Sequence, residues 1–146
     1  MSGPDPEHTR PEGVDNATVD AVGKLSEALE AVEQARGHLY GFHRLTGTAD
    51  LTLGDAITLL KDAGHTELAD RLDRELLGRN VLLGRWTFQV VEDYDDGYYA
   101  TFKELEALTR ERLVGGRRHL YEAEMKENRR SRGRPGHEAK PEDVDG

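Results

Sequence analysis

The positions of its prolines constrain this 146-residue sequence more than any other feature. None occurs between residues 12 and 134, and 34% of all residues are charged against 36% hydrophobic. Because proline removes a backbone donor and clashes with the preceding turn, helix interiors exclude it. The pattern predicts an all-α fold with a thin core. The five prolines are Pro4, Pro6, Pro11, Pro135 and Pro141.

The spacing of apolar residues predicts where the first helices lie. A helix is expected to begin near Asn16 or Thr18, both good N-cap residues, and to end before Gly47. A short helix over 53–63 should stop at Gly64, and a third should cover 66–78. The inward stripe expected on the first helix consists of Val22, Leu25, Leu29, Val32 and Leu39.

The segment after Gly84 carries two competing patterns. Trp86, Phe88 and Val90 alternate as in a β-strand. Over a longer window, however, apolar residues recur every three or four positions as far as Leu113, and this length favours a helix over 86–114. The pair Gly115-Gly116 should then break or bend that helix.

Together these elements predict an elongated antiparallel helical bundle of two long helices and two short connecting ones. The bundle domain is expected to span 16–130, with a basic helical extension at 117–130. Residues 1–15 and 131–146 combine proline, glycine and charge with almost no apolar anchor, which is typical of disordered tails.

Sequence signatures of catalysis are missing. There is no phosphate-binding glycine loop, dinucleotide fingerprint, zinc-protease helix or nucleophile elbow, and no cysteine. Glu-x-x-His pairs of di-iron bundles are absent too. The acidic run 92–96 spreads around its helix and is better explained by the helix dipole than by a cation. We therefore expect no catalytic residues, no metal site and no cofactor.

One polar cluster stands out. Arg36 and His43 fall within the apolar stripe of the first long helix, and Asp95 falls within that of the last. Because an unpaired charge between packed helices is costly, Asp95 should contact Arg36 or His43, with Tyr94 or Tyr98 completing the hydrogen bonds. Such a cluster is either a buried pair that fixes the helix register or a ligand pocket.

Basic residues are concentrated between residues 110 and 134, where nine cationic and four acidic side chains sum to +5 in a chain of net charge −9. This segment could bind RNA or an acidic partner, or lie against the protein's own acidic groups. The helix pair at 53–78 has an acidic second helix, so duplex DNA is not expected as a partner. The basic-patch candidates are Arg110, Arg112, Arg117, Arg118, Arg129 and Arg130.

Two stretches, GRWTFQVVEDYDDGYY (84–99) and GGRRHLYEAEMKENRR (115–130), resemble a family of small uncharacterised helical proteins from high-GC actinobacteria. The resemblance would cover about residues 18–137. It implies a lineage and no particular activity.

These observations favour a non-enzymatic helical interaction module that self-associates or binds a protein partner. One alternative is a small-molecule or metal-binding bundle that uses the polar cluster, and another is RNA or acidic-partner binding through 110–134. No apolar run is long enough for a membrane span, and the polar N-terminal residues lack a secretory stretch, so we expect a cytoplasmic protein.

Overall fold

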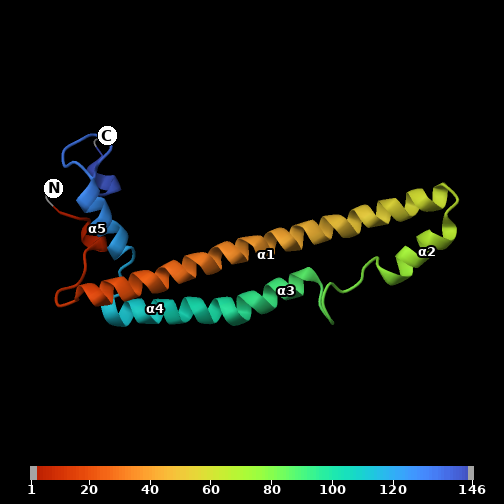
Figure 1. The fold of residues 1–146 in the computed structure, drawn as a ribbon, viewed down its shortest axis with the longest axis horizontal. Helices are drawn as coiled ribbons and strands as arrows, with labels where there is room; N and C mark the ends of the chain where they lie inside the picture. Colours follow the sequence, from red (N-terminus) through yellow and green to blue (C-terminus); the bar gives the residue numbers. More distant parts are fainter. Residues whose placement is uncertain (1–2, 145–146) are drawn as a thin grey trace. The chain divides into compact units, whose positions relative to one another are not determined.

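The computed structural model describes residues 3–144; residues 1–2 and 145–146, the outer ends of the two predicted tails, lie outside the described part. Over that part the fold is all-α with no strand, as the sequence predicts; only one isolated bridge joins Leu82 to Arg85. The α-helices are α1 (Asn16–Asp62), α2 (Thr66–Glu75), α3 (Thr87–Tyr94), α4 (Ala100–Val114) and α5 (Leu120–Arg129) (Figure 1). Short 3-10 turns occur at Pro6–His8 and Pro141–Asp143.

Helix α1 is a single helix of 47 residues. Asp15 caps its start, since the Asp15 carboxylate accepts a hydrogen bond of 2.8 Å from the Thr18 amide. The predicted stop at Gly47 and the separate helix over 53–63 are wrong. Gly47 does not adopt the left-handed conformation that ends helices, and a helical glycine costs only about 1 kcal/mol relative to alanine.

The end of α1 lies at Gly64, as predicted. Gly64 has a φ of 91°, and the amide of His65 donates to the carbonyl of Leu60 at 2.8 Å, which closes the helix end. Helix α2 begins at Thr66 as expected but ends at Glu75, three residues before Gly78. The predicted pair of short connecting helices is therefore one.

The helical interpretation of 86–114 is confirmed. Helix α3 passes through a π-helical turn at Asp95–Tyr99 directly into α4. The start is capped from within, because the Gln89 side chain accepts a hydrogen bond from the Trp86 amide at 2.8 Å. Gly115 and Gly116 both have positive φ angles and end the helix, as their pairing suggested.

The chain forms two compact units, to which α1 contributes residues in both cases. We call Met1–Ala31 with Phe102–Gly146 the terminal unit, and Val32–Thr101 the internal unit. The core of the terminal unit consists of Val19, Val22, Val114 and Leu120.

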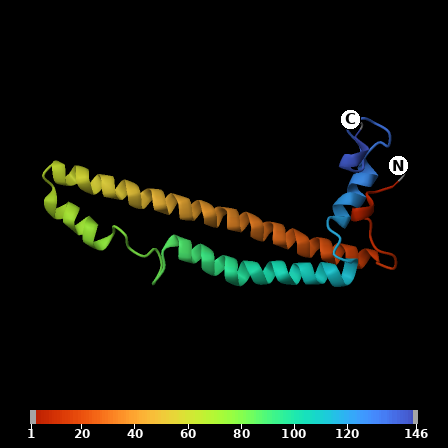
Figure 2. The same ribbon diagram turned by 180° about the vertical axis from the view of Figure 1, so that it is seen from behind.

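Contacts hold the described parts of both tails, which the sequence analysis expected to be disordered. Arg10 forms two hydrogen bonds, of 2.8 and 3.1 Å, with the Glu124 carboxylate, and the Arg117 guanidinium donates to the carbonyl of Thr9. Near the other end, Lys126 donates to the carbonyl of Ala139 at 2.9 Å. Charged side chains thus supply the anchors that apolar residues do not. Figure 2 shows the N-terminal segment beside α5.

In the internal unit, α3 lies alongside α1 in both views (Figures 1 and 2). Few of its side chains are buried: Val32 and Ile57 from α1, Ala69 from α2, and Thr87 and Val91 from α3. Many large apolar side chains stay exposed instead. Within residues 3–144, no helix is both long and apolar enough to cross a membrane.

Candidate functional site

The predicted contact between Asp95 and Arg36 is present. Arg36 on α1 holds the carboxylate with two parallel hydrogen bonds, Nε to Oδ1 at 2.8 Å and Nη2 to Oδ2 at 3.1 Å. This fork-to-fork geometry is the strongest form of an arginine–carboxylate pair. The two side chains are 30% and 22% exposed, so the pair is half-buried and in reach of water.

Two tyrosines enclose the Arg36 guanidinium, and the sequence analysis did not assign either of them to the pair. The Tyr40 hydroxyl donates to Asp95 Oδ2 at 3.1 Å and accepts from Arg36 Nη2 at 3.2 Å. The guanidinium carbon lies 4.4 Å from the centre of the Tyr99 ring and 5.0 Å from that of Tyr40. Cation–π attraction therefore adds to the ion pair. The signal in the sequence is the spacing of four between Arg36 and Tyr40.

The π-helical turn explains why Asp95 and Tyr99 both reach α1. The Ala100 amide donates to the carbonyl of Asp95, five residues back, so this turn is wider than an α-helical one. Tyr99 also donates to the Glu33 carboxylate at 2.7 Å. The wide turn thus carries both α1 contacts, and such turns are frequent at functional sites.

Electrostatics keep this cluster charged. The hydrogen bond from Arg36 lowers the pKa of Asp95, against a smaller opposing effect of burial. The same bond raises the pKa of Arg36, and the hydrogen bond to Glu33 raises the pKa of Tyr99. A carboxylate with a lowered pKa is a poor proton carrier near neutral pH, so the cluster suits binding or positioning better than acid–base chemistry.

The other predicted members lie apart from the ion pair. His43 Nδ1 is 2.7 Å from the hydroxyl of Thr87, a buried residue at the start of α3. Tyr94 and Tyr98 stack on each other at a tilt of 38°, with ring centres 5.8 Å apart. Of the two partners proposed for Asp95, the structure therefore selects Arg36, and His43 marks a second polar contact further along α1.

A shallow apolar hollow adjoins that second contact. Its volume is about 320 Å³ and it opens to solvent. Gly78 forms one side of the framework, since its amide donates to Asp50 at 2.9 Å and its carbonyl accepts from the Trp86 indole at 3.1 Å. The lining residues are Thr46, Gly47, Asp50, Leu51, Arg79, Val81, Trp86 and Thr87.

Several of the basic-patch candidates are engaged within the terminal unit. Arg110 pairs with the buried Glu106 at 2.7 Å and also donates to the carbonyl of Gly116. Arg130 pairs with Glu127 at 2.7 Å, which lowers the pKa of that glutamate. Arg112, Arg118 and Arg129 are exposed. The patch is thus divided between self-paired and solvent-facing arginines.

Known proteins supply no template for these sites: neither family models, nor curated proteins, nor solved structures gave a match to this chain.

Proposed function

We propose that this chain is a non-enzymatic helical interaction module that pairs with a second copy of itself through the outward face of α1. The observation that carries this proposal is a row of side chains spaced alternately three and four residues apart. We call it the outer seam; it consists of Phe42, Leu45, Ala49, Thr52, Ala56 and Leu59.

Three large side chains of the outer seam are left uncovered by the chain itself. Leu45 is 72% exposed, Leu59 67% and Phe42 42%. At 100° per residue the whole seam occupies a stripe about 100° wide, and alternate spacings of three and four are the signature of a helix that packs against another helix. The residues of α1 that contact α3, such as Arg36 and His43, lie on a different face.

The order of side chains along the outer seam suits a second copy. If two α1 helices cross antiparallel about a two-fold axis between residues 50 and 51, Leu45 meets Ala56 of the second copy, and Ala49 meets Thr52. Small residues then lie at the centre, where backbones approach closely, and Phe42 meets Leu59 at each end. A two-fold axis makes one patch complementary to itself.

An elongated antiparallel bundle is part of the same proposal. Along the internal unit, Glu33 contacts Tyr99, Arg36 contacts Asp95, and His43 contacts Thr87. One set of numbers rises while the other falls, which supports antiparallel packing. Two such helical pairs that share the outer seam would form a four-helix arrangement with a core on both sides of α1.

Sedimentation equilibrium tests the proposal directly. The full chain should form a dimer, and Leu45→Glu should make it monomeric, because two charges would be buried in the seam. Leu83→Glu is the matched control, since Leu83 is 96% exposed outside the seam and should leave the dimer intact. A wild-type chain that remains monomeric at high concentration contradicts self-association.

Orientation can be read from disulfides, because the natural chain has no cysteine. A mixture of Ala49→Cys and Thr52→Cys chains should cross-link to each other under oxidising conditions. Parallel pairing would instead link Ala49→Cys chains to themselves.

The apolar hollow supports a second candidate function, binding of a small apolar molecule. Trp86 is the only tryptophan of the chain and lines the hollow, so its fluorescence reports on occupancy. A naphthalene sulfonate dye that binds there should change Trp86 emission, and Gly47→Leu should abolish that change by filling the hollow. Binding that survives this substitution would exclude the hollow as its site.

A further inference from the structure

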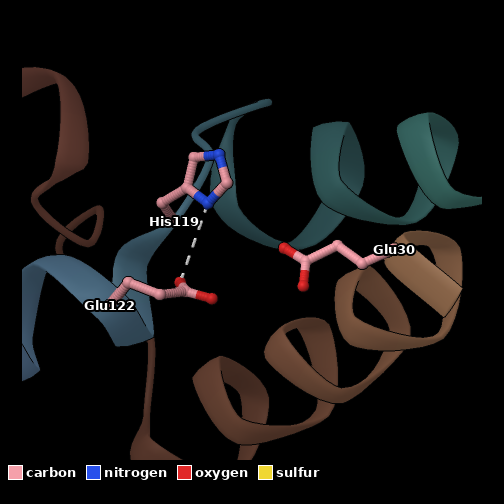
Figure 3. A group of neighbouring side chains, drawn as sticks. All are labelled: Glu30, His119 and Glu122. Carbon is pink, nitrogen blue, oxygen red and sulfur yellow. Dashed lines mark ion pairs between the residues drawn. The ribbon is translucent and has the colours of Figure 1, made fainter. Parts of the chain in front are cut away.

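Three potential metal ligands converge in the terminal unit, in a group to which the sequence analysis gave no role. Glu30 comes from α1, His119 from the residue before α5, and Glu122 from the first turn of α5. One ligand atom of each lies within 4.8 Å of the other two. Figure 3 shows the Glu30 carboxylate turned toward the space between His119 and Glu122.

The ligand set has a defined chemical preference. One imidazole nitrogen and two carboxylates match the donors of Zn²⁺ and its first-row neighbours better than those of Ca²⁺ or Mg²⁺, which take oxygen alone. Their two negative charges would balance a divalent cation. Zinc binds such atoms at about 2.0–2.2 Å, so the three must close by roughly 1.5 Å, which long, exposed side chains can do.

A second observation at the same place concerns His8. Its ring centre is 6.3 Å from that of His119, and its Nδ1 lies 3.3 Å from an oxygen of Asp5. A carboxylate on one ring nitrogen is the usual partner of a metal-binding histidine, because it leaves the other nitrogen free to coordinate. His8, His119 and Glu122 line one hollow of about 310 Å³, which has room for an ion and its water.

We propose that Glu30, His119 and Glu122 form a zinc site, with His8 placed to supply a fourth ligand. The three ligands come from both sides of the Gly115-Gly116 turn, so the bound ion would tie α5 to α1 within the terminal unit. This inference does not depend on self-association, because none of the three residues belongs to the outer seam.

Calorimetric titration of the full chain with ZnSO₄ is the primary test. The wild-type chain should bind one Zn²⁺, and each of His119→Ala, Glu30→Gln and Glu122→Gln should weaken binding at least tenfold. His38→Ala and His65→Ala are matched controls, since both histidines are exposed and lie elsewhere; they should change nothing. No binding to the wild-type chain, or binding that Glu30→Gln leaves unchanged, would overturn the site.

Two further measurements separate coordination from structural damage. Co²⁺ should bind in place of Zn²⁺ and give visible d–d bands that Glu30→Gln diminishes while the far-ultraviolet circular dichroism stays unchanged. Affinity should also fall as pH drops below about 6.5, because histidine must lose its proton to bind a metal. Bands that survive Glu30→Gln, or affinity independent of pH from 7 to 5, would contradict coordination by these residues.

Discussion

At the scale of single residues, the Arg36–Asp95 pair is the best-defined polar contact of the internal unit. It combines two hydrogen bonds, two tyrosine rings and partial exposure. Because water reaches both partners, the pair aligns the helices without the large desolvation cost of a fully buried pair. Its sequence signal was the presence of opposite charges within two apolar stripes; the π-helical turn that aims Asp95 has no such signal.

Removal of the Asp95 charge should destabilise the fold only where that charge exists. A carboxyl group whose pKa is lower in the folded chain stabilises the fold above its unfolded pKa, and this stabilisation is lost as pH falls through the folded value. Asp95→Asn should therefore lower the urea midpoint at pH 7, and the difference should fade well below pH 4. Asp96→Asn, at an exposed neighbouring carboxylate, is the control. Equal midpoints for Asp95→Asn and wild type at pH 7 would contradict the argument.

Two adjacent residues near the end of α4 provide the sharpest test of the terminal core. Val114 is fully buried against Val19, Val22 and Leu120, whereas Leu113 is 46% exposed. Val114→Ala should cost about 2 kcal/mol of unfolding free energy because it leaves a cavity. Leu113→Ala should cost less than about 0.5 kcal/mol although it removes more atoms. Chemical denaturation of both variants checks this order.

At the scale of elements, glycine was the hardest residue to interpret from sequence. Gly47 and Gly64 look alike there, and each was expected to end a helix, but only Gly64 has a positive φ. The helical periodicity was sufficient to place α2 and the 86–114 rod. It could not reveal that α1 continues through Gly47, nor that α5 places His119 near Glu30, because both depend on backbone geometry and long-range packing.

The two glycines should respond in opposite ways to alanine. Gly47→Ala should stabilise the fold by about 0.5–1 kcal/mol, since the position is helical and an added Cβ meets no atom within 4 Å. Gly64→Ala should destabilise by about 1 kcal/mol, because a φ of 91° strains any side chain. Thermal unfolding of both variants gives the signs, and a destabilising Gly47→Ala would mean that α1 is not continuous there.

At the scale of the whole molecule, the chain has too little interior for its apolar content. The described residues bury few apolar side chains, while leucines as large as Leu45, Leu51 and Leu59 face solvent. Large exposed apolar surface is typical of proteins that bind a partner. The polar composition, with 34% charged residues, is then adequate for an assembly with shared interfaces even though it is meagre for an isolated chain.

Such an assembly couples stability to concentration. If the outer seam pairs two copies, each tenfold increase in protein concentration favours the dimer by about 1.4 kcal/mol, and the melting midpoint should rise by several degrees. Leu59→Glu should remove that dependence, because its melting then reports a monomer. Leu83→Glu should keep the dependence, since Leu83 is outside the seam. A wild-type midpoint that is the same at all concentrations would place the folding unit in the single chain, and the exposed leucines of α1 would then require a partner other than a second copy.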